Sequence, residues 1–168
     1  VEAIGAHPNV DLQTLLLPIV GVDKDTLVRE KQDGILWFNH IYSDQNGPTG
    51  LIGSPTDLAR LAMAYLNGGE LNGQRILSEE SVSMMTHESH IVPGDTPDAA
   101  AFDEMFQGLG WAVVPTGNSF YLTHSGGGPG FSTNMQLYPD RNLGLVIMAN
   151  GTYLDRDRIL DLAASLDW

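Results

Sequence analysis

The sequence predicts an α+β fold, an α/β sandwich in which helices flank an antiparallel sheet. Two observations lead to this fold class. Segments before residue 90 carry apolar residues at helical spacing, whereas four short segments between residues 110 and 149 are rich in aromatic and β-branched residues. Short turns separate these four segments, and short connections join antiparallel neighbours.

The N-terminal part of the chain is predicted to contain two short helices. Val10–Leu17 shows mixed apolar spacing and is ended by Pro18, which a helix interior does not tolerate. Asp23 provides a cap for a second, weakly amphipathic helix that runs through Gln32 and stops at Gly34.

A third helix is predicted to begin at Ser54. Ser54 is the cap, Pro55 occupies the first helical position, and the carboxylate of Asp57 lies near the free N–H groups of the first turn. Asn67-Gly68-Gly69 ends this helix, because glycine adopts the left-handed conformation of a C-cap. The apolar residues that recur at helical spacing between these ends are Leu58, Leu61, Ala62, Tyr65 and Leu66.

Turn and loop signals follow this helix. Asn72-Gly73 predicts a tight turn, and Ser78-Glu79-Glu80 begins a further helix that reaches about Thr86. From His87 to Asp103 the chain is rich in Pro, Asp, Ala and Gly without a period, which indicates a surface loop.

Strand signals dominate from residue 110 onward. The four predicted strands are Gly110–Val114, Phe120–Thr123, Phe131–Tyr138 and Leu143–Ala149. A closing helix over Asp155–Leu166 is predicted to cover one face of the sheet with an apolar stripe, namely Ile159, Leu162, Ala163 and Leu166.

The composition excludes several functional classes. The 168 residues, 42% of them hydrophobic, suffice for one globular domain with a substantial core. The formal net charge of -13 and the pI near 4.4 argue against nucleic acid and anionic membranes as partners, because both attract clustered Lys and Arg. The absence of cysteine excludes disulfides and thiolate catalysis. The sequence shows neither a signal peptide nor a bilayer-spanning stretch, so the compartment stays open.

The run His124-Ser125-Gly126-Gly127-Gly128-Pro129-Gly130 lies between two predicted strands. His124 and Ser125 are expected to point to opposite faces of the strand end, while Gly126 and Gly127 let the backbone approach a ligand without a Cβ in the way. A backbone N–H there stabilises the negative oxygen that develops when an acyl carbonyl is attacked. The pattern indicates one wall of an acyl-transfer site; the structural alternative is a glycine-rich turn with an incidental histidine.

Several landmarks follow one another along the chain: Gly50-Leu51-Ile52-Gly53-Ser54-Pro55-Thr56-Asp57-Leu58-Ala59-Arg60, a helix ending in Leu66-Asn67-Gly68-Gly69, Arg75-Ile76-Leu77-Ser78, Gly108-Leu109-Gly110-Trp111 and His124-Ser125-Gly126-Gly127. From Gly47 to the C-terminus the chain resembles the C-terminal half of β-lactamase-related serine hydrolases, which include class C β-lactamases, D-Ala-D-Ala carboxypeptidases and related esterases. The resemblance implies a β-lactamase/transpeptidase-like fold that lacks its N-terminal part. Residues 1–168 are therefore expected to form a single partial domain, from a family that is often periplasmic or secreted.

The resemblance also implies roles for the glycine run, which matches the family's Lys/His-Ser/Thr-Gly motif. It implies that His124 belongs to the proton-transfer and electrostatic network and that Ser125 hydrogen-bonds a substrate carboxylate or carbonyl. It further implies that Gly126 and Gly127 form the oxyanion-binding segment, with the Gly127 N–H supplying part of the oxyanion hole.

Two other elements of the family are not found. The family's nucleophile is the serine of a Ser-x-x-Lys motif, but neither Lys24 nor Lys31 lies three residues after a serine. For the Tyr-x-Asn motif, Tyr42-Ser43-Asp44 lies too close to Gly50, and Tyr65-Leu66-Asn67 is better explained as a buried helix residue and a C-cap. The chain alone is therefore expected to be catalytically incomplete.

Three functional interpretations stay open. In the first, the chain is part of a hydrolase for a small acyl substrate (a β-lactam, a D-Ala peptide or an ester), and a separate N-terminal half supplies the nucleophile. In the second, it is a non-catalytic module derived from that fold, which either binds a partner or self-associates as a homo-oligomer through an open sheet edge. In the third, Ser125 acts with His124 or His40, although adjacent strand residues face opposite ways. No set of metal ligands is evident around His87 and His90, so neither a metal nor another cofactor is expected.

Overall fold

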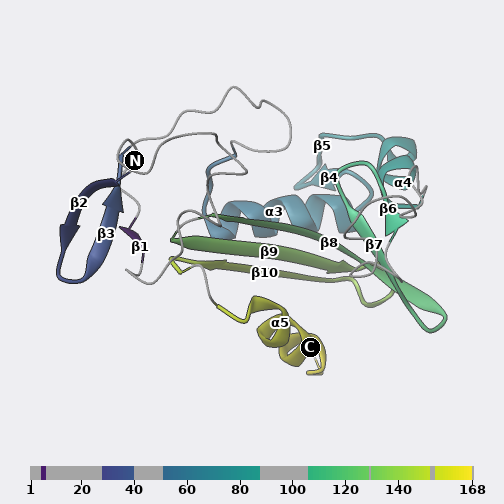
Figure 1. Cartoon of the computed structure of the whole chain (residues 1–168). Coiled ribbons are helices and arrows are strands. Elements are labelled where there is room, and N and C mark those ends of the chain that lie inside the picture. Colours follow the sequence, from purple (N-terminus) through teal and green to yellow (C-terminus); the bar gives the residue numbers. More distant parts are fainter. Residues whose placement is uncertain are drawn as a thin grey trace. The chain divides into compact units, whose positions relative to one another are not determined.

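The computed structural model describes residues 5–6, 28–39, 51–87, 106–128, 130–151 and 154–167 (Figure 1). The chain divides into two compact units. The first unit comprises Val1–Gly53, Gly126–Thr133 and Met148–Arg156, and the second comprises Ser54–Ser125, Asn134–Ile147 and Asp157–Trp168. The predicted helix over Val10–Leu17 and residues 88–103 of the predicted loop lie outside the described residues. A single partial domain over residues 1–168 stays a prediction.

A small antiparallel sheet in the first unit replaces a predicted helix. β2 (Val28–Gln32) and β3 (Ile35–Phe38) form a hairpin, and β1 (Gly5–Ala6) pairs with β3. The turn is Asp33-Gly34, and its two residues have φ values of 52° and 80°. Positive φ at both positions gives the two-residue turn that follows the twist of paired strands. The predicted helix from Asp23 to Gln32 is therefore wrong over Val28–Gln32, because the Asp-Gly turn pairs this part with the following segment, while residues 23–27 lie outside the described residues.

Helix α3 (Pro55–Leu66) begins at the predicted cap in the second unit. The Asp57 N–H donates to Ser54 Oγ at 3.2 Å, and Asp57 Oδ2 accepts from Ser54 N at 3.2 Å and from Ser54 Oγ at 2.7 Å. These hydrogen bonds lower the pKa of the Asp57 carboxyl below its ordinary value. A depressed folded-state pKa means that this contribution to stability is present at neutral pH and is lost as the pH falls through that pKa.

The C-terminal end of α3 depends on Gly69. Its N–H donates to Ala64 O at 2.7 Å, and its carbonyl accepts from Ile76 N at 2.8 Å and Leu77 N at 3.1 Å. Gly69 has a φ of 92°, and a Cβ added there would lie 2.3 Å from Leu77 O. Glycine alone combines this backbone conformation with so close an approach. The predicted end of the helix at Asn67-Gly68-Gly69 is confirmed.

We expect Gly69→Ala to lower the free energy of unfolding by about 2–3 kcal/mol, because it adds overpacking to the strain of a left-handed backbone. Gly73→Ala is the matched control: Gly73 also has a positive φ, 78°, but an added Cβ there has no heavy atom within 4 Å. The control should cost about 1 kcal/mol, the conformational part alone. Urea unfolding followed by circular dichroism measures both variants. Equal losses would show that Leu77 does not lie against Gly69.

The predicted turn after α3 and the predicted helix that begins at Ser78 are also confirmed, although the helix includes His87, which was assigned to the loop. β4 (Glu70–Leu71) and β5 (Gln74–Arg75) pair around the predicted turn at Asn72-Gly73. α4 (Glu79–His87) follows, and the Ser81 N–H donates to Ser78 Oγ at 3.0 Å. Ser78 therefore caps α4, as the sequence indicated.

A five-stranded sheet follows with the strand order β10-β9-β8-β7-β6. Its strands are β6 (Phe106–Gln107), β7 (Ala112–Thr116), β8 (Ser119–Gly128), β9 (Phe131–Tyr138) and β10 (Leu143–Ala149). β7 pairs antiparallel with both β6 and β8. The predicted bounds of β9 and β10 are confirmed, whereas β8 continues through the glycine run that was predicted to end it.

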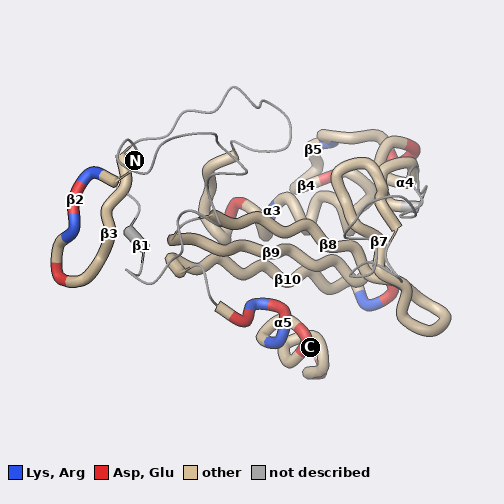
Figure 2. The backbone as a smooth tube through the Cα atoms, in the orientation of Figure 1, with Lys and Arg blue, Asp and Glu red and all other residues tan. Residues whose placement is uncertain are grey.

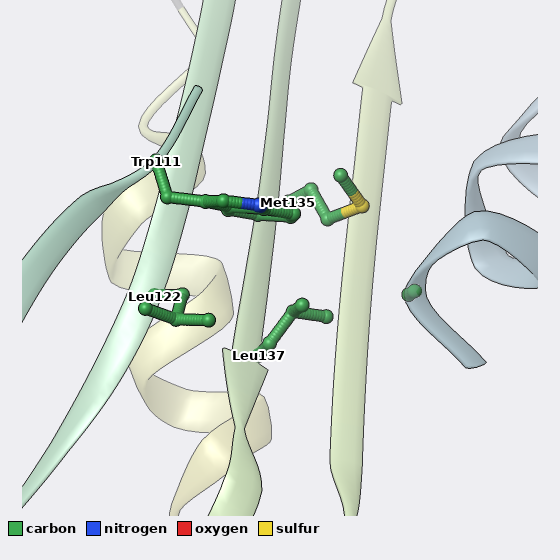
Figure 3. Packing of buried hydrophobic residues seen from close by; sticks show 5 residues of the cluster. Trp111, Leu122, Met135 and Leu137 are labelled. Atoms are coloured by element: carbon green, nitrogen blue, oxygen red, sulfur yellow. The ribbon is translucent and has the colours of Figure 1, made fainter. Parts of the chain in front are cut away.

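One face of this sheet carries the hydrophobic core of the second unit. Trp111, Leu122, Met135 and Leu137 pack with Ala62 of α3, and Leu122 and Leu137 are only 2% and 1% exposed. Figure 3 shows these side chains projecting from the strands on the side of α3. Burying each large apolar side chain contributes about 1.5–3 kcal/mol. This layer holds α3 against the strands of the second unit.

Helix α5 (Arg156–Ala164) lies on the other face, but not with the predicted stripe. Asn134, which alternates along β9 with core residue Met135, donates from Nδ2 to Asp157 Oδ1 at 2.8 Å. Leu160 is buried, whereas three residues of the predicted stripe are exposed, namely Ile159, Leu162 and Leu166. The prediction of this stripe is wrong because the sheet face under α5 is polar. The helix turns toward it the face that carries Asp157 and Leu160.

Charged residues avoid the five-stranded sheet. Strands β6 to β10 contain no Lys, Arg, Asp or Glu, and Figure 2 shows charges gathered instead on the β2–β3 hairpin, α4 and α5. Among the described helices, none has both the length and the apolar character needed to cross a bilayer.

Candidate active site

The C-terminal end of β8, which consists of Gly126–Gly128, belongs to the first unit. A Cβ added to Gly126 would lie 2.8 Å from Thr133 Oγ1, and one added to Gly128 would lie 2.6 Å from the Phe131 ring. At Gly127 the nearest atoms are 3.7 and 3.8 Å away, which is ordinary van der Waals contact. Packing therefore accounts for glycine at positions 126 and 128. It does not account for Gly127, the position assigned to the oxyanion donor.

Arg156, the first residue of α5, binds this strand end within the first unit. Its Nη1 donates to Gly126 O at 2.8 Å, to Thr133 O at 2.9 Å and to Ser132 Oγ at 3.0 Å. Hydrogen bonds from a guanidinium are about twice as strong as neutral ones. Sequence reasoning missed Arg156, because 30 residues separate it from Gly126 and no motif spacing connects them. The one signal in the sequence was that a positively charged residue, Arg156, follows the last predicted strand.

His124 and Ser125 lie on β8 within the second unit, and both are exposed. The pairing between β7 and β8 ends at Thr123, so His124 and Ser125 lie beyond the last β8 residue that pairs with β7. Strand side chains alternate, so His124 shares the face of core residue Leu122. Ser125 shares the face of Thr123, whose Oγ1 donates to Asn134 Oδ1 at 2.8 Å on the α5 side. This alternation argues against His124 as a base for Ser125.

Several serines that the structure describes already serve local structure. Ser54 and Ser78 cap helices, Ser119 donates to Asp140, Ser132 accepts from Arg156, and Ser165 donates to Leu162 O. Lys31 is exposed on β2, and no serine lies three residues before it. These five hydroxyls are therefore poor candidates for an attacking nucleophile.

Among the described tyrosines, Tyr65 alone stands in a Tyr-x-Asn sequence, and it packs against the hydrophobic core. The ring of Tyr65 meets Trp111 edge-on at 5.0 Å, and its Oη contacts Met85 Sδ at 3.6 Å, so Tyr65 is a core residue as the sequence indicated. Tyr121 and Tyr138 stack at 5.2 Å. Burial raises the pKa of Tyr121 and raises that of Tyr138 to about 12. Both phenols therefore hold their protons more tightly than a free tyrosine does.

Some residues considered from the sequence have no described position. His40, Tyr42 and His90 lie outside the described residues, as does the side chain of His87. Within the described part of the chain, His, Asp and Glu side chains form no group that could hold a metal ion. The candidate site consequently rests on the end of β8 and on Arg156.

The chain matches the protein family described as "Beta-lactamase" over residues 15–167. It is similar to a penicillin-binding protein from Bacillus halodurans, with 18% sequence identity and a TM-score of 0.52, over 67% of this chain and 30% of that chain. It is also similar to a tyrosine-to-phenylalanine mutant of a class C β-lactamase, with 18% identity and a TM-score of 0.50, over 79% and 37% of the two chains. No curated protein sequence matched the chain.

These comparisons confirm the predicted fold class and the resemblance. The two solved structures share the fold, and the chain spans 30% and 37% of their lengths. The family match extends over residues 15–167 and thus includes the strands that carry the glycine run. The chain belongs to the β-lactamase family.

Proposed function

We propose that the chain supplies the strand wall of an acyl-transfer site in a β-lactamase-like serine hydrolase. The observation that carries the proposal is that β8 continues beyond the residues that pair with β7, as the segment His124–Gly127. The side chains of His124 and Ser125 in this segment are exposed. In this role the Gly127 N–H donates to the oxyanion, and Ser125 hydrogen-bonds a substrate carboxylate or carbonyl. His124 takes part in proton transfer and in the electrostatics of the site.

The proposal includes a nucleophile from outside residues 1–168. No Ser-x-x-Lys motif occurs in the sequence, and the described serines that cap helices or bind arginine are already engaged. A backbone donor on a fixed strand stabilises a developing negative charge, but it forms no covalent intermediate. We therefore assign oxyanion stabilisation and substrate orientation to this chain. A serine and a lysine elsewhere perform the attack on a β-lactam, a D-Ala peptide or an ester.

An experiment on the isolated chain tests directly whether it is catalytically incomplete. We expect no stoichiometric acyl-enzyme when the purified protein is mixed with a chromogenic β-lactam or a p-nitrophenyl ester and then weighed by mass spectrometry. A covalent adduct on any of its serines would overturn this part of the proposal.

The positive test uses the DNA upstream of the Val1 codon. An open frame that encodes Ser-x-x-Lys there should yield, when expressed together with residues 1–168, a protein that acquires one acyl group per molecule. A folded product that hydrolyses none of the three substrate classes would contradict the proposed function.

A second candidate function, self-association through a sheet edge, is favoured by β10. This strand lies at one end of the strand order and reads Leu143-Gly144-Leu145-Val146-Ile147-Met148-Ala149. It contains neither a charged residue nor a proline, which are the usual means of protecting an edge from pairing. Sedimentation velocity over a range of concentrations should then show a dimer. A monomer at every concentration would contradict edge pairing.

A further inference from the structure

We propose that Arg156 is a positioning residue that fixes and polarises the peptide group between Gly126 and Gly127. The inference rests on the proposed function, because it concerns the N–H assigned to the oxyanion. It extends the site to a residue of α5 that lies outside the glycine run.

The contact of Arg156 reaches the proposed donor through a single peptide group. Its Nη1 donates to Gly126 O at 2.8 Å, and this carbonyl belongs to the same planar unit as the Gly127 N–H. The described peptide bonds are all trans, so this carbonyl and this N–H point in opposite directions. Arg156 therefore lies on the side of the peptide away from the proposed oxyanion. It acts through the peptide and not by touching substrate.

The guanidinium is held in place by the neighbouring strand. The same Nη1 donates to Thr133 O at 2.9 Å and to Ser132 Oγ at 3.0 Å, and Ser132 is 5% exposed. These acceptors on β9 orient the guanidinium toward β8. Because several acceptors hold the guanidinium in place, its geometry does not have to reorganise during the reaction. Such a fixed geometry is the condition for strong electrostatic stabilisation.

The positive charge of Arg156 matters because strands β8 and β9 contain no charged residue of their own. β8 and β9 contain no Lys, Arg, Asp or Glu, so a neighbouring element has to bring a cation to this end of the strand pair. A cation that hydrogen-bonds a carbonyl polarises the whole amide, and hydrogen bonds in series strengthen one another. Arg156 thus makes the Gly127 N–H a better donor to a negative oxygen than an isolated strand amide would be.

Nuclear magnetic resonance tests the contact in the chain itself. The amide nitrogen of Gly127 responds to hydrogen bonding at Gly126 O, because both belong to one peptide group. We expect Arg156→Met to move the Gly127 amide resonance and Arg156→Lys to restore it in part. The control Arg60→Met, which removes a surface guanidinium from α3, should leave it unmoved. If the methionine variant does not fold, Arg156→Leu, which likewise has no hydrogen-bond donor, replaces it. An unmoved Gly127 resonance in a folded variant overturns the proposal.

Kinetics test the role in the complete open reading frame that contains this chain. We expect Arg156→Met to lower kcat about 10-fold, the scale of one hydrogen bond to a charged group, with a smaller change in KM and with recovery in Arg156→Lys. A moved Gly127 resonance with unchanged kcat overturns the positioning role. If the unmodified complete protein shows no acyl transfer, the proposed function fails, while the resonance shift still decides whether Arg156 binds the Gly126 carbonyl.

Discussion

Gly127→Pro, made in the complete open reading frame that contains this chain, is expected to lower kcat about 10²–10³-fold. Proline has no backbone N–H, so the substitution removes the proposed oxyanion donor and leaves the side chains of His124 and Ser125 in place. The donor acts on charge that develops in the transition state. The loss should therefore appear in kcat and only weakly in KM.

The matched control for this experiment is Gly127→Ala. An added Cβ at this position meets Phe131 O at 3.7 Å and Arg156 Nη1 at 3.8 Å, both ordinary contacts, and the N–H stays. The alanine variant should keep most of the activity, and circular dichroism should show both variants folded. Equal activities for a folded proline variant and the unmodified protein would contradict the role of Gly127.

Leu137→Ala is expected to lower the free energy of unfolding of the chain by about 2–5 kcal/mol. Leu137 is 1% exposed in the core cluster with Leu122 and Met135, so the substitution removes buried apolar surface and leaves a cavity beneath α3. Urea unfolding, followed by tryptophan fluorescence, to which the buried Trp111 contributes, and by circular dichroism, measures the change.

Leu162→Ala is the control for the core substitution, because it removes the same atoms from an exposed position on α5. Leu162 is 60% exposed, and such surface changes usually stay within about 0.5 kcal/mol. A loss at Leu162 as large as that at Leu137 would show that the stripe with Ile159 and Leu166 is buried after all. It would thereby contradict the orientation that the contact between Asn134 and Asp157 gives to the helix.

Local chemistry made much of the second unit predictable. Ser54, Pro55 and Asp57 act within one turn, so their pattern identified the start of α3 without knowledge of the rest of the fold. Turn residues likewise marked the ends of β9 and β10. The continuation of β8 through Gly128 was not predictable, because glycine has low strand propensity and the strand depends on the close approach of Phe131 and Thr133.

The predictions were wrong where the structure of a segment depends on its contacts with another segment of the chain. Apolar spacing chose the wrong face of α5, because it carries no information about the polar sheet face beneath the helix. The hairpin at Asp33-Gly34 differs from the prediction because Gly34 was interpreted as the stop of a helix, whereas Asp33 and Gly34 both adopt positive φ in a two-residue turn. The candidate residues His124, Ser125, Gly126 and Gly127 came from one contiguous motif. Arg156 came only from the structure, since a side chain that approaches from another element leaves no spacing to read.

The central claim is that residues 1–168 provide the wall of the site that binds the oxyanion, and that the attacking serine lies outside them. Peptide mapping by mass spectrometry, after the complete open reading frame has reacted with a β-lactam or an activated ester, tests this most directly. We expect a single acylated serine in a Ser-x-x-Lys motif outside residues 1–168. Acylation of Ser125 or any other serine within residues 1–168 would contradict it.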